Sequence, residues 1–122
     1  MPLAKNVMRA GVSAGAARAI NGNEVQSALP AAGTTQGTAV AMEADLNVIS
    51  TATTGQGCIL SSYAIQGDDQ VVYNSTSADI LVYPPSGGNF NQLAANSGFV
   101  LGPYTAARCL KVTSTQWVGF VS

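Results

Sequence analysis

The sequence predicts an all-β protein, a small antiparallel β-sandwich or jelly-roll-like domain with an extended N-terminal arm. The chain has 122 residues, which fits one domain, and small and β-branched residues dominate its composition. Short apolar runs alternate with turns rich in Ser, Thr and Gly, often at the spacing of about 8–12 residues typical of sandwiches and barrels. No segment after Ala28 shows a convincing helical period.

The first 25 residues differ in composition and charge from the rest. They are rich in Ala and Gly, lack a sustained period of two, and carry three cations, Lys5, Arg9 and Arg18, before the first acid, Glu24. From Glu24 onward six acids stand against two bases, so a segment of charge +3 precedes a body of charge −4. We therefore predict an arm over residues 1–25 and a β-domain over residues 26–122.

Three interpretations of the basic arm stay open: a weak contact with nucleic acid, a contact with an acidic protein surface, and a solvated tail. Three cations give only a weak, salt-sensitive attraction to nucleic acid, and no aromatic residues interleave with them as a stacking platform requires. We expect the arm to become ordered on a partner protein, with Lys5, Arg9 and Arg18 as contacts, and expect no direct nucleic-acid partner. No apolar run approaches the length of a membrane span or of a signal-peptide core, so no membrane partner is expected.

Eight candidate strands follow in order along the domain. They are residues 38–42, 46–51, 58–65, 70–74, 80–83, 99–101, 107–112 and 116–121. In the segment 39–49, Met42, Leu46 and Ile49 could instead share one helical face, but strand is preferred there. We predict two hairpins, over residues 70–83 and 107–121. Several strands are apolar on both faces, which indicates burial between two layers or against a neighbouring subunit.

The segment LVYPPSGGNFNQLAANSGF, residues 81–99, interrupts this pattern. Pro84 and Pro85 supply no backbone N–H, so the preceding strand must end there or run along an edge. Two glycines allow a tight reversal, and we predict a rigid structural crossover. Phe90 lies among amides in this loop. It is either an exposed anchor for a partner or an aromatic that folds back to cap an open end of the domain.

The sequence excludes several kinds of catalytic and metal site and indicates none. The chain has no histidine, so nucleophiles that use a histidine base are excluded, and neither lysine has the S-x-x-K spacing. Asp68 and Asp69 fit a polar turn before a strand. Cys58 and Cys109 are either a disulfide or two buried free thiols, and two cysteines without histidine argue against zinc. We expect no catalytic, cofactor or metal site and no enzymatic activity.

One resemblance covers most of the chain, from about Ala28 to Phe120. The order ALPAAGTTQGTA, LNVISTATTGQGCIL, GDDQVVYNSTSADILVYPPSGGNFNQLAANSGFVL and TQWVGF resembles a group of small virion structural proteins of tailed bacteriophages. Its strongest part is VVYN-x(4)-DILVYPPSGG-x-FNQLAANSGF followed by TQWV, a pattern without a catalytic signature. The arm, residues 1–25, is outside the resemblance.

The resemblance implies a small β-sandwich or jelly-roll-like unit that acts as a capsid cement (decoration) protein. Such a protein sits on the capsid surface of the virion, is assembled in the host cytoplasm, and has the major capsid protein and itself, as a homotrimer, for partners. The alternatives are a trimeric tail-fibre or spike domain that binds a host receptor, and a head–neck component. A net charge of −1 with few charged residues fits a surface that is buried against partners.

Overall fold

The computed structural model describes residues 24–122, and this part of the chain is built from ten β-strands and one 3-10 turn. The arm residues Lys5, Arg9 and Arg18 lie outside the described residues. The elements are β1 (Val25–Pro30), η1 (Gln36–Thr38), β2 (Val40–Ala41), β3 (Leu46–Thr51), β4 (Gly57–Ile59), β5 (Asp69–Asn74), β6 (Ile80–Tyr83), β7 (Asn89–Phe90), β8 (Phe99–Leu101), β9 (Ala106–Lys111) and β10 (Gln116–Val121).

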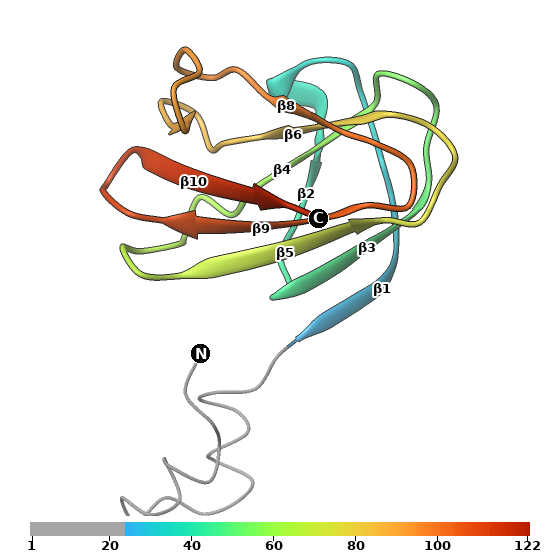
Figure 1. Cartoon of the computed structure of the whole chain (residues 1–122), viewed down its shortest axis with the longest axis horizontal. Coiled ribbons are helices and arrows are strands. Elements are labelled where there is room, and N and C mark those ends of the chain that lie inside the picture. Colours follow the sequence, from blue (N-terminus) through green and yellow to red (C-terminus); the bar gives the residue numbers. More distant parts are fainter. Residues whose placement is uncertain (1–23) are drawn as a thin grey trace, which may run out of the picture.

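The strands form two mixed sheets (Figure 1). Sheet A has the order β1-β3-β5-β9-β10-β7, and sheet B has the order β2-β4-β6-β8. From β1 to β6 the chain passes from one sheet to the other at each step, and each strand pairs in parallel with the strand two before it. This part is a solenoid-like stack of three chain turns. Strands β8 and β9 then run antiparallel to β6 and β5, which ends the stack.

The all-β class is confirmed, and each of the eight predicted strands is present in some length. The strand predicted over 58–65 is cut to β4, and β1 and β7 were missed. The prediction of an antiparallel arrangement is wrong, because five of the eight strand pairs are parallel. The spacing of strands along a sequence carries no information on their direction. A chain that changes sheet at each turn returns to its first sheet running the same way.

One predicted hairpin is confirmed and the other is wrong. β9 and β10 pair antiparallel, with Gly119 opposite Cys109. β5 and β6 lie in different sheets and do not pair. The residues between them form a corner at which the Asn74 side chain accepts a hydrogen bond from the Thr76 amide at 3.0 Å. Ser, Thr and Asn are common both in hairpin turns and at corners between sheets, so the local sequence does not distinguish a hairpin from a corner.

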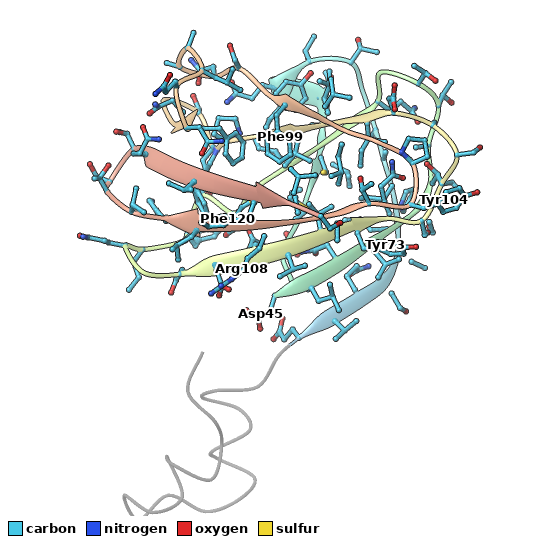
Figure 2. All side chains as sticks on the ribbon, viewed as in Figure 1. Asp45, Tyr73, Phe99, Tyr104, Arg108 and Phe120 are labelled. Atoms are coloured by element: carbon cyan, nitrogen blue, oxygen red, sulfur yellow. The ribbon has the colours of Figure 1, made fainter. Side chains whose placement is uncertain are left out.

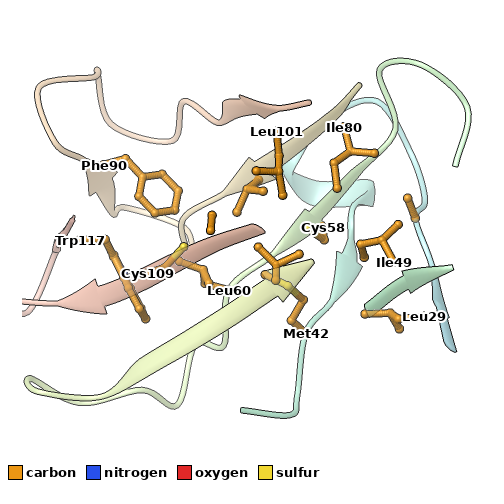
Figure 3. Packing of buried hydrophobic residues seen from close by; sticks show 14 residues of the cluster. Leu29, Met42, Ile49, Cys58, Leu60, Ile80, Phe90, Leu101, Cys109 and Trp117 are labelled. Carbon is orange, nitrogen blue, oxygen red and sulfur yellow. The ribbon is translucent and has the colours of Figure 1, made fainter. Parts of the chain in front are cut away.

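The two sheets enclose one hydrophobic core (Figure 3). Its largest fully buried apolar side chains are Trp117, Phe90, Met42 and Ile49. Cys58 and Cys109 are free and buried within it, so the disulfide alternative is wrong. Burial raises the pKa of each thiol from 9.0 to about 12, and for Cys58 the neighbouring Cys109 adds to the effect.

Buried amide side chains hold the ends of β5 to the connections between the sheets. Gln70 donates from Nε2 to the carbonyls of Met42 and Ala44, each at 3.0 Å. At the other end of the strand, Asn74 donates from Nδ2 to three carbonyls, those of Ala78, Leu101 and Gly102. Every buried side-chain nitrogen and oxygen of the described residues has a hydrogen-bond partner. These bonds offset the desolvation of polar groups in the core.

The segment between Tyr83 and Phe99 is a crossover, as the sequence indicated, and it also carries a strand. Gly87 has φ of 86°, and the Gly88 amide closes a turn onto the Pro85 carbonyl at 2.8 Å. The chain then adds β7 to the edge of sheet A, parallel to β10, before it returns to sheet B as β8. The loop thus ties the two sheets together at one end.

Candidate functional site

Two ionisable side chains that the sequence singled out, Lys111 and Asp68, are engaged in local structure. The Lys111 ammonium donates to the Ala64 carbonyl at 2.7 Å and lies 5.9 Å from the centroid of the Trp117 ring. Asp68 accepts a hydrogen bond from the Ile65 amide at 2.9 Å, which confirms the predicted polar turn. Within residues 24–122 there is no group of three or more His, Cys, Asp or Glu side chains placed to hold a metal ion. That part of the chain also holds no helix long and apolar enough to cross a bilayer.

Phe90 lies in the core, so the prediction that it is an exposed contact to a partner is wrong. Its side chain is fully buried and meets the Phe99 ring edge-on, with ring centroids 4.8 Å apart. The neighbouring amides face β10: Asn91 accepts from the Gly119 amide at 3.2 Å. Alternation along β7 then turns the Phe90 ring inward between the sheets. The alternative interpretation, an aromatic that folds back onto the domain, agrees with this position.

The most prominent candidate for function is the outer face of sheet A, on the side away from sheet B. Strand alternation and register place nine apolar side chains, one ion pair and three further polar side chains on it. The apolar side chains are Val25, Leu46, Val48, Val71, Tyr73, Ala106, Leu110, Val118 and Phe120, and the ion pair is Asp69–Arg108. The further polar side chains are Ser50, Asn89 and Gln116.

A row of side chains runs straight across this outer face. Val25 stands opposite Leu46, which stands opposite Val71 on β5, and the row continues through Arg108 to Phe120. At its two ends Val25 and Phe120 are 57% and 56% exposed. Figure 2 shows Tyr73, Arg108 and Phe120 on neighbouring strands of this sheet. Four of the five side chains in this row are apolar, and such a grouping is typical of a contact surface rather than of single scattered residues.

One ion pair lies within the outer face. Arg108 donates from Nε to Asp69 Oδ2 at 2.8 Å, with the Arg108 side chain 55% exposed. An exposed pair of this kind contributes only about 0–1 kcal/mol to stability. It adds a charged, directional feature to a largely apolar surface.

The outer face of sheet B is partly covered by the chain itself. Tyr83 is 7% exposed, and its ring lies against Gly57 and Gly98, where an added Cβ would come within 2.7 and 2.9 Å of ring carbons. The Tyr83 hydroxyl donates to the Thr34 carbonyl at 3.3 Å. Gln36 in η1 donates to the Pro84 carbonyl at 2.8 Å. The segment around η1 is thereby held against this side of the molecule.

Acidic residues gather at one end of sheet A. Strands β1, β3 and β5 are parallel and start at the same end. Five of the six acids of residues 24–122 lie at or just before these starts: Glu24, Glu43, Asp45, Asp68 and Asp69. We call this the acidic end of sheet A. It borders the outer face on the side where the chain enters β1 (Figure 1).

Two exposed tyrosines lie far from one another. Tyr63, 93% exposed, belongs to the connection before β5, and Tyr104, 63% exposed, to the connection before β9. Since β5 and β9 are antiparallel, these connections lie at opposite ends of the strands. The two rings do not form one aromatic cluster.

No protein-family model matches the chain, and no curated protein matches it. The assignment of function therefore depends on the surface and on the resemblance in sequence. Sequence reasoning named Phe90 in the loop, and it predicted that strands apolar on both faces are buried between two layers or against a neighbouring subunit, but it did not identify the outer face of sheet A as the surface concerned. The signal was present, since several strands are apolar at both odd and even positions.

Proposed function

We propose that this chain is a non-enzymatic virion structural protein of a tailed bacteriophage, a capsid cement protein that bridges major capsid protein subunits. The observation that carries the proposal is the outer face of sheet A, where nine apolar side chains from five strands surround one ion pair. Such a surface favours a protein that works by burying area against other subunits. The resemblance of residues 28–120 to phage virion proteins supplies the class of partner.

The mechanism of a cement protein is additional buried area between capsomers. Each square ångström of apolar surface removed from water contributes about 25 cal/mol, so a broad sheet face is an effective contact. A homotrimer would engage the shell at three sites at once, which turns modest affinity at one site into high avidity. The finer fold, a β-sandwich or jelly-roll-like unit, belongs to this proposal and is supported by two sheets around one core.

The alternatives are a tail-fibre or spike domain that binds a host receptor and a head–neck component. Receptor-binding tips often present a cluster of exposed aromatic residues. Tyr63 and Tyr104 are exposed at opposite ends of the described strands, which favours the cement protein over a tip domain.

Copy number in purified heads separates these functions. We expect a number near that of the major capsid protein. A far lower number, or presence on tails alone, would exclude the cement function.

A binding assay then tests the surface. Heads stripped of the protein should bind the native chain and the control variant Ser77→Ala, which changes an exposed corner residue. The double variant Tyr73→Ser/Phe120→Ser should bind much more weakly while unfolding at a similar urea concentration. Equal binding of the two variants would show that the shell contacts another surface.

A further inference from the structure

We propose that in the free chain residues 1–20 fold back over the outer face of sheet A of the same chain, with their cations at the acidic end. The proposal concerns the unassembled protein and does not depend on the phage assignment. Residues 1–20 would cover the one broad apolar surface that the described residues leave exposed.

A cover over the outer face would favour a free monomer. Soluble monomers seldom expose a continuous apolar patch larger than a few hundred Å². Here nine apolar side chains share one face, and the whole chain has a net charge of only −1 to oppose association. The chain covers part of sheet B with the segment around η1. A second internal segment would do the same for sheet A.

The arm joins the domain beside the row of side chains that runs from Val25 to Phe120 across the outer face. The Glu24 amide donates to Asp45 Oδ2 at 2.9 Å, and the Glu24 carbonyl accepts from the Leu46 amide at 3.0 Å. These two bonds fix the entry point next to Val25, the first residue of the row. The residues before Glu24 therefore begin within reach of the surface.

The sequence just before this point favours a reversal of the chain. Asn21-Gly22 is the dipeptide that most strongly favours a tight two-residue turn, because both residues tolerate positive φ. Such a turn would bring the preceding residues back beside β1 at the edge of sheet A, from which the rest of the segment could continue over the outer face. Without it, a continuation of β1 would carry them away from the domain.

Charge is complementary between the two parts. The arm carries Lys5, Arg9 and Arg18 with no acid, and the acidic end of sheet A carries five acids. Among the described residues the only ion pair is Arg108–Asp69, so the other acids of this end have no cationic partner there. Three cations brought close would lower the repulsion among these carboxylates.

The length and composition of residues 1–20 also fit a position over the outer face. Twenty extended residues reach up to about 65 Å, whereas a row across five strands spans about 20 Å. Between the cations the arm offers apolar side chains to the face. They are Leu3, Val7, Met8, Val12 and Ile20.

Cysteine labelling of the full-length chain tests the proposal. Both native thiols are buried with a pKa of about 12, so they should stay unreactive at pH 8 and leave an introduced thiol as the only reporter. Tyr73→Cys places the reporter on the outer face, and Ser77→Cys places a control at the exposed corner after β5. Val48→Cys replaces Tyr73→Cys if that variant does not fold.

The reporter at position 73 should react several-fold more slowly than the control. Charge reversal of the arm, Lys5→Glu/Arg9→Glu/Arg18→Glu, should raise its rate several-fold and leave the rate at position 77 unchanged. Equal rates with the native and the reversed arm would overturn the proposal. Protection that disappears on dilution would also overturn it, because a second copy would then be the cover.

Discussion

The two faces of sheet A have a similar apolar content and different surroundings. On the inner face Trp117 and Phe90 are almost completely buried, since sheet B and the crossover loop lie over them. On the outer face Phe120 is 56% exposed. The difference does not come from the residue types, because a phenylalanine occurs on each side. It comes from what lies opposite each face. Apolar alternation along a strand therefore shows which residues share a face, but it does not show which face is the core.

The largest expected effect comes from a matched pair of substitutions. Phe90→Ala should lower the free energy of unfolding by about 3–5 kcal/mol, because it leaves a cavity between the sheets and removes the edge-on contact with Phe99. Phe120→Ala on the outer face should lower it by less than about 1 kcal/mol. Urea unfolding of both variants measures the contrast. Similar losses for the two would mean that the faces are equally buried in solution.

The next largest loss of stability should come from removal of a buried amide on the inner side of β5. Asn74→Ala leaves the carbonyls of Ala78, Leu101 and Gly102 without their donor, at a cost of about 1–3 kcal/mol. Thermal or urea unfolding gives the value. Ser77→Ala, three residues along at an exposed position, is the control and should stay near the native chain. If Asn74→Ala and Ser77→Ala had the same free energy of unfolding, the corner between the sheets would not depend on these bonds.

Alkaline pH should destabilise the core through its two thiols, one from each sheet. Above pH 9.0 the unfolded state loses thiol protons while the folded state, with pKa of about 12, keeps them. The unfolded state then binds fewer protons, so stability is complete below pH 9 and falls as pH rises toward 12. At pH 10 the loss should be roughly 1 kcal/mol for each thiol.

Melting temperatures between pH 8 and pH 10.5 test this. The variant Cys58→Ala/Cys109→Ala is less stable at pH 8 because it loses packing, but its stability should fall less steeply with pH. Parallel curves for the variant and the native chain would assign the alkaline loss to other groups.

The outer ion pair should have a smaller effect than any buried group. Arg108→Ala removes a partner of Asp69 on an exposed surface, and the change in unfolding free energy should stay below about 1 kcal/mol. Raising the salt concentration should reduce even this difference. In a chain that lacks residues 1–20, a loss as large as that of Asn74→Ala would contradict the exposed position of this pair.

Deletion of residues 1–20 should leave the domain folded. The β-domain should still unfold cooperatively, as circular dichroism during urea titration would show, because its core residues begin at Leu29. Binding to phage heads should weaken. Loss of folding in the deletion variant would show that the segment is part of the core.

Local sequence determined which segments form strands. Residues 46–51, 80–83 and 116–121 have β-branched and aromatic residues between Ser, Thr and Gly turns, and each is a strand. The hairpin at Thr113–Thr115 and the polar turn at Asp68 were also predictable, because turn chemistry acts over a few residues.

The tertiary structure alone decided how these strands are arranged. The direction of pairing, the corner at Asn74, the inward turn of Phe90 and the exposure of the outer face all depend on residues distant in sequence. A strand with two apolar faces can bury either one, and its neighbours in space select which. The sequence thus determined the elements and excluded histidine-based chemistry. Packing between the two sheets decided which face became the core and which was left as the candidate contact surface.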